Sequence, residues 1–184
     1  MKNFALTIYS MILVVIGSTG CSNGHSQSDA KAAELKAFDE EDVKLFTPYM
    51  TGDVEQARQS LKQTIQHLKA STVLDPRSKS GGLSIDYFRL YALESRIGHT
   101  ADAQDALMLG RYWRIRNMEP PEATNDADII YVMSMTPEQI LKVVDVFDAG
   151  DNKNGSRPKY LQYVTNSAAK TPPNTALEPT PTAP

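Results

Sequence analysis

Helix start and stop signals recur from Ala30 to Phe147, and no segment there alternates apolar and polar residues as a half-buried strand does. The clearest start is Asp53, because Gln56 follows it at the spacing of a capping box. Apolar residues then recur at helical spacing on one face, at Val54, Ala57, Leu61, Ile65 and Leu68. The sequence therefore predicts an all-α fold, a small bundle or solenoid of helical hairpins.

Proline and glycine predict where the central helices end. The helix from Asp53 is expected to run to about Leu74, because Pro76 disfavours helical geometry in the residue before it. Residues 77–82 are expected to form a loop, and Ser84 is expected to open the next helix, with Asp86 in its first turn. Apolar side chains at 87–97 cover more than one face, so this helix should be the most enclosed.

The following helices have equally clear signals. Gly98 should end one helix and Thr100 should cap the next, in which Gly110 implies close approach of a neighbouring helix. Residues 125–135 form an apolar run that can be either a helix or a buried strand. Thr136, followed by proline and then by Gln139, predicts a capped helix that ends at Gly150. Residues 29–46 form a further helical stretch.

Length and composition predict one soluble domain without affinity for nucleic acid. Apolar residues make up 41% of the 184-residue chain and charged residues 22%, which is ordinary for a globular domain. The formal charge of −3 provides no basic surface for phosphate contacts. A nucleic-acid partner is therefore not expected.

The single cysteine, Cys21, follows an export signal. Lys2 precedes an apolar segment, residues 4–16, which is shorter than the roughly 20 residues of a membrane-spanning helix. Small residues at 17–20 then lead into Cys21, and this segment resembles the lipobox of bacterial lipoproteins. The family usually has Leu where Ser18 stands. An ordinary signal peptide followed by an unpaired cysteine is the alternative.

The lipoprotein resemblance implies the location of the mature chain. Residues 1–20 would be removed as the signal peptide, and Cys21 would receive a diacylglyceryl group and an N-acyl chain such as palmitate, together enough for stable anchoring. Ser22, rather than Asp, after the cysteine implies the outer membrane, facing the periplasm. Polar residues at 21–28 are expected to form a flexible tether, followed by a helical domain at residues 29–164.

Residues 165–184 are expected to be a disordered tail, because five prolines fall among the last thirteen residues. Residues 176–181 resemble tails on integron gene-cassette proteins, which implies a mobile accessory gene and no role for the tail. The alternative is a linker or a stalk that spans the cell wall.

A repeated frame relates two of the predicted helix starts. Glycine, alanine five residues on and leucine four residues further occur both at Gly52, Ala57 and Leu61 and at Gly98, Ala103 and Leu107. The frame resembles the helical-hairpin repeat of the tetratricopeptide family, in which glycine makes the turn and alanine allows close packing. The frames lie 46 residues apart rather than about 34. An unrelated bundle with similar hairpins remains the alternative.

Candidate site residues are few. His25, His67 and His99 show no pair at metal-binding spacing, and residues 148–155 lack two calcium ligands and are expected to form a solvated turn, so neither a metal nor a cofactor is expected. Glu94-Ser95 resembles the catalytic pair of lytic transglycosylases, which implies a peptidoglycan-acting enzyme as the alternative function. The favoured interpretation is a module that binds an envelope protein, with Tyr112 and Tyr131 as candidate contacts.

Overall fold

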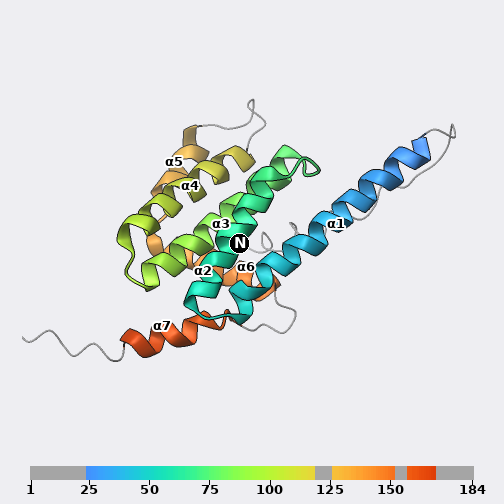
Figure 1. Ribbon diagram of the computed structural model, residues 1–184. Coiled ribbons are helices and arrows are strands. Elements are labelled where there is room, and N and C mark those ends of the chain that lie inside the picture. Colours follow the sequence, from blue (N-terminus) through green and yellow to red (C-terminus); the bar gives the residue numbers. More distant parts are fainter. Residues whose placement is uncertain (1–23, 119–125, 152–156, 169–184) are drawn as a thin grey trace, which may run out of the picture.

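The computed structural model describes residues 24–118, 126–151 and 157–168, and every element in these ranges is a helix (Figure 1). The expected all-α class is therefore confirmed. The signal peptide, Cys21 and residues 169–184 lie outside the described residues. The helices are α1 (Gly24–Thr51), α2 (Val54–Ala70), α3 (Pro76–Arg96), α4 (Thr100–Met118), α5 (Asp126–Ser134), α6 (Pro137–Asp151) and α7 (Tyr160–Ala168).

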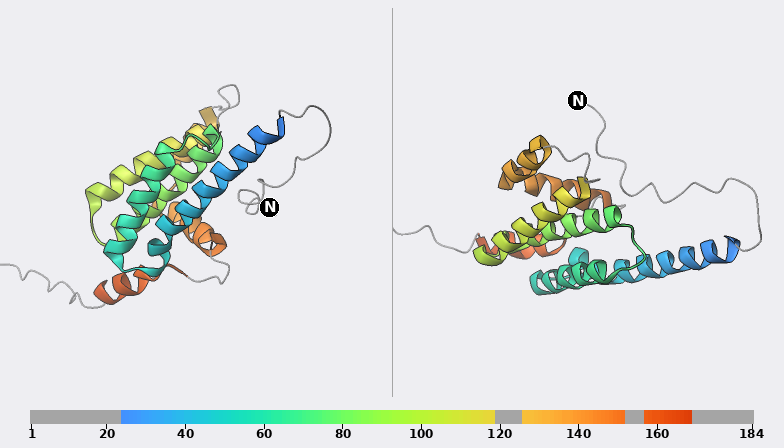
Figure 2. Two further views of the ribbon diagram at one scale, coloured as in Figure 1. Left: turned by 45° about the vertical axis from the view of Figure 1, so that its right-hand side comes forward. Right: turned by 90° about the horizontal axis from the view of Figure 1, so that it is seen from above.

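The helices pack in layers. Seen from above, α1 and α2 form one layer, α3 and α4 form the next, and α5 and α6 lie on its far side (Figure 2). Helix α3 is the centre of the bundle, because it packs against α2, α4 and α6. Its buried residues run on several faces from Leu83 to Leu93, so the expectation that this helix is the most enclosed agrees with the packing.

The repeated glycine frame marks the turns of two antiparallel hairpins, α1–α2 and α3–α4. A Cβ at Gly52 would lie 2.6 Å from the carbonyl oxygen of Pro48, so the first turn has no room for a side chain. Gly98 has a φ of +81°, which side chains other than glycine rarely adopt. The alanine after each turn, Ala57 or Ala103, is buried in the seam between helices.

The expected loop at residues 77–82 is wrong, and so is the helix start at Ser84. Helix α3 begins at Pro76, because the Asp75 carboxylate accepts hydrogen bonds from the backbone N–H groups of Arg77 (2.9 Å) and Ser78 (3.0 Å). Proline is well tolerated at the first helical position, because the backbone N–H that it lacks would have no partner within the helix there. Pro76 therefore starts a helix here, and α2 ends at Ala70 rather than near Leu74.

Asp86 was expected in the first turn of its helix. Because α3 begins earlier, at Pro76, Asp86 lies far from that turn. It is buried in the middle of α3, and its Oδ1 accepts a hydrogen bond from Arg89 at 3.0 Å. Gly82 lies inside α3, where a Cβ would come within 3.2 Å of the Leu68 side chain. Close packing of α2 on α3 thus explains a glycine that the sequence suggested was part of a loop.

Other boundaries differ at the ends of the domain. Helix α1 begins at Gly24, inside the expected tether, and α7 extends to Ala168, inside the expected disordered tail. Once a helix has nucleated, each added residue gains a hydrogen bond, so polar residues extend it easily. Helix α7 was not predicted; Tyr160 anchors it in the core with its ring centroid 5.6 Å from that of Tyr49.

The remaining expectations concern residues 126–151. Residues 126–134 form a helix, which decides between the two structures that the sequence allowed. The Thr136 capping box is present, because its N–H donates to Gln139 Oε1 at 2.7 Å and its Oγ1 accepts from the Gln139 N–H at 3.3 Å. Helix α6 continues one residue beyond the expected end at Gly150.

Candidate functional site

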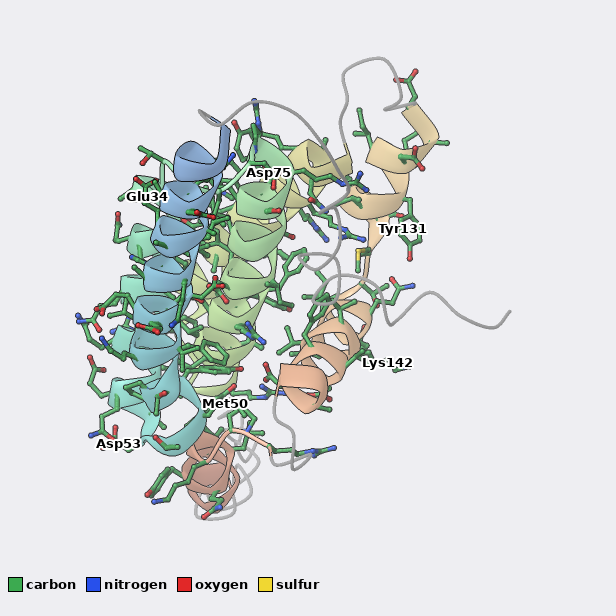
Figure 3. The ribbon with its side chains drawn as sticks, turned by 90° about the vertical axis from the view of Figure 1, so that its right-hand side faces the viewer. Glu34, Met50, Asp53, Asp75, Tyr131 and Lys142 are labelled. Atoms are coloured by element: carbon green, nitrogen blue, oxygen red, sulfur yellow. The ribbon has the colours of Figure 1, made fainter. Side chains whose placement is uncertain are left out.

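Tyr112 and Tyr131 are both exposed, as expected of contact residues, and Figure 3 shows Tyr131 on the outer side of α5. They belong to a larger set of exposed apolar side chains on α4 and α5, two helices that pack against each other. We call this set the α4–α5 surface. It comprises Met108, Leu109, Tyr112, Ile129, Ile130, Tyr131 and Met133.

The α4–α5 surface exists because α5 is short, apolar and covered on one side only. Among the described residues of α5, Val132 alone is buried, while Ile130 and Tyr131 are 65% and 61% exposed. A soluble domain ordinarily exposes its large apolar side chains singly, so several of them on two helices in contact make this the candidate interaction surface. Sequence reasoning identified the two tyrosines but not the aliphatic residues, since burial depends on tertiary packing.

Arginines border the α4–α5 surface along the second half of α4. The Arg116 guanidinium lies 5.6 Å from the centroid of the Tyr112 ring, and Tyr112 in turn packs edge-on against Trp113. Arg111 donates from Nη2 to the carbonyl oxygen of Met135 at 2.7 Å and so connects α4 to the segment between α5 and α6. These contacts fix the aromatic rings and leave positive charge beside the apolar residues.

Glu94 lies in a cluster of ionic side chains at the turn between α3 and α4. The carboxylate is 1% exposed, and Arg58 of α2 donates to its Oε1 at 2.5 Å. The His99 ring nitrogen Nδ1 lies 3.0 Å from Oε2. Arg58 also donates from Nη2 to Asp102 Oδ2 at 2.7 Å. Glu94 is thus paired through both carboxylate oxygens.

The structure brings His99 to two carboxylates, a convergence that sequence reasoning missed. His99 and Asp102 are three residues apart, an ordinary helical spacing, but Glu94 lies five residues before His99 and the chain reverses at Gly98 between them. His67 is elsewhere, with its ring stacked on Phe38 at 4.2 Å. The side chain of His25 lies outside the described residues.

A second ionic cluster is buried between α1, α3 and α6. Asp148, which was expected in a solvated turn, is buried and accepts hydrogen bonds from Arg89 Nε at 2.8 Å and from the Tyr49 hydroxyl at 2.7 Å. Burial of the phenol, with further contributions from nearby Tyr160 and Asp148, holds the pKa of Tyr49 well above its ordinary value. This cluster has a structural role, because it links three helices without a solvent-facing group.

Within the described residues, no helix combines the length and apolar character needed to cross a bilayer. In comparisons with known proteins, the chain matches no family model, no curated protein and no solved structure.

Proposed function

We propose that this chain is a lipid-anchored protein of the bacterial envelope that acts as a helical binding or assembly module. The observation that supports binding most directly is the α4–α5 surface, where large apolar side chains are exposed on two adjacent helices. Its anchor would be acylated Cys21, at the outer membrane and facing the periplasm. We also propose that the two hairpins are tetratricopeptide-like units, on the strength of their matching turns.

The shape of α1 suits a tethered module. This helix has 28 residues, about 42 Å at 1.5 Å per residue, and its N-terminal half extends beyond the other helices (Figure 1). It begins at Gly24, close to Cys21 in the sequence. A lipid on Cys21 would therefore hold the bundle on a helical stalk, with the α4–α5 surface free to contact another protein.

The chemistry of the surface indicates the kind of partner. Apolar residues such as Ile130 and Tyr131 require apolar side chains opposite them, and the neighbouring Arg114 and Arg116 favour carboxylates at the rim. We therefore expect an envelope protein that presents an acidic, amphipathic segment. Aromatic and arginine side chains are the residue types that contribute most at such interfaces.

The alternative, a peptidoglycan-acting enzyme that uses Glu94, has less support. An acid catalyst must present a carboxyl oxygen to the glycosidic bond within hydrogen-bond reach. Both Glu94 oxygens already have partners, Arg58 and His99, and the side chain is buried. A sugar would have to displace Arg58 from Oε1 or His99 from Oε2 before it could pair with this carboxyl group.

Site-specific photo-crosslinking in living cells tests the binding function. A photoreactive residue in place of Ile130 should form an adduct with one envelope protein, whereas the same residue in place of Val43 should not. Val43 is the matched control, because it is also 65% exposed but lies on α1. Replacing Arg114 and Arg116 with glutamate should reduce the Ile130 adduct.

Three outcomes would contradict the proposal. Equal labelling from Ile130 and Val43 would show that the α4–α5 surface has no preferred partner. An adduct of twice the mass of the chain would assign the surface to self-association instead. Digestion of peptidoglycan by the purified wild type, lost in Glu94→Gln at unchanged helicity, would favour the enzyme.

A further inference from the structure

The cluster at the α3–α4 turn has the composition and spacing of a metal site. Glu94 comes from the end of α3, His99 from the turn and Asp102 from the first turn of α4. One ligand atom from each of these three side chains can be chosen so that all three atoms lie within 4.8 Å of one another. Histidine nitrogen and carboxylate oxygen are common ligands of zinc in proteins.

The distances between these atoms are close to those of a coordination sphere. Bonds of 2.0–2.1 Å in a tetrahedral zinc site separate neighbouring ligand atoms by about 3.3 Å. Glu94 Oε2 and His99 Nδ1 are 3.0 Å apart, and His99 Nδ1 and Asp102 Oδ2 are 4.0 Å apart. Asp102 is the carboxylate farther from His99, and its side chain is 55% exposed and therefore has room to rotate toward the ring.

The cluster combines one buried ligand with two that solvent can reach, as a metal-binding site requires. Glu94 is buried at the end of α3, and Arg58 donates to its Oε1, which leaves Oε2 facing His99. The His99 and Asp102 side chains are half exposed, so an ion can enter from solvent, and water can complete its coordination.

The charges in the cluster favour a dication. Two carboxylates against one guanidinium leave a net charge of −1 while the His99 ring is neutral. In the ion-free pair, a ring N–H can donate to Glu94 Oε2. Zinc would take the place of that proton, because its ligands must be deprotonated. Arg58 competes for Asp102, since its Nη2 lies 2.7 Å from Oδ2, and therefore limits the affinity.

We propose that Glu94, His99 and Asp102 bind a zinc ion, which joins the end of α3 to the start of α4. This inference does not depend on the proposed binding function, because the α4–α5 surface uses other residues. Either proposal can fail while the other holds.

Calorimetric titration with zinc chloride tests the site. We use the full-length chain in detergent, with Cys21→Ser in every sample so that no thiol binds the ion. One zinc ion per chain should bind, and His99→Ala or Asp102→Asn should weaken binding about tenfold or more. Asp105→Asn is the matched control, because Asp105 is also exposed on α4 but is not part of the cluster. It should bind zinc like the parent.

A second variant separates a metal site from a purely structural ion cluster. Arg58→Met removes the competing guanidinium, so zinc should raise its unfolding midpoint at least as much as it raises that of the parent. Absence of saturable binding by the parent, or His99→Ala binding as tightly as Asp105→Asn, would overturn the proposal. So would a smaller zinc-induced shift for Arg58→Met than for the parent.

Discussion

Gly110 allows α4 to lie directly against α3. A Cβ at this position would be 2.5 Å from a ring carbon of Phe88, which is buried at the centre of the bundle. The Ser84 hydroxyl reinforces the contact, because it donates to the Gly110 carbonyl oxygen at 3.2 Å. The hairpin that supports the α4–α5 surface therefore depends on the absence of one side chain.

We expect Gly110→Ala to lower the free energy of unfolding by about 1–3 kcal/mol, because the buried ring cannot move away without strain. Urea denaturation measures the change. Gly150→Ala is the control, since a Cβ there meets nothing within 4 Å, and it should leave stability unchanged or raise it by up to about 1 kcal/mol. Equal stability of the two variants would show that α3 and α4 are not packed this closely.

At the scale of elements, α7 secures the first hairpin. Tyr160 is fully buried, and its hydroxyl accepts a hydrogen bond from Arg96 Nη1 at 3.0 Å. The Lys159 N–H donates to the carbonyl oxygen of Met50, at 2.9 Å, so the segment before α7 is attached to the end of α1. Tyr160 and the backbone bond at Lys159, together with the partly buried Leu161 and Val164, thus attach a helix of nine residues.

Two truncations separate α7 from the segment that follows it. Deletion of residues 169–184 should leave the midpoint of thermal unfolding unchanged, because their prolines do not favour a packed element. Deletion of residues 160–184 should lower it clearly, since the loss of a large buried aromatic side chain costs about 3 kcal/mol or more. Circular dichroism measures both midpoints. A fall after the shorter deletion would show that the tail docks on the domain.

At the scale of the whole molecule, the proposed anchor and the bundle are joined by α1. Only the C-terminal part of this helix contributes to the core, through Tyr49 and the partly buried Phe38, Phe46 and Met50. Residues 29–34 are exposed. The core therefore does not depend on residues 29–34, and we expect that Cys21 can be replaced without disturbing the bundle.

We expect Cys21→Ser to release the chain from membranes and to abolish incorporation of labelled palmitate. Fractionation and metabolic labelling measure the two effects, and unchanged helicity in solution is the control for folding. Labelling of the variant equal to that of the wild type would contradict lipidation at Cys21.

The sequence by itself determined the all-α class, the two glycine turns and the capping boxes at Asp53 and Thr136. These features are local, because each depends on hydrogen bonds or sterics within a few residues. A local signal also gave a wrong prediction where one residue type occurs both at the start and after the end of helices. Pro76 both stops one helix and starts another, and the Asp75 cap together with the packing of Gly82 against Leu68 decided in favour of a helix.

Only the tertiary structure decided which side chains are buried and which charges meet. Asp148 pairs with Tyr49 across 99 positions of the sequence, and Glu94 pairs with Arg58 across 36. No periodic pattern encodes such pairs, since their geometry arises when helices distant in sequence come together. For the same reason the sequence suggested Tyr112 and Tyr131 as contacts but did not reveal the surrounding α4–α5 surface, which exists because α5 is covered on one side only.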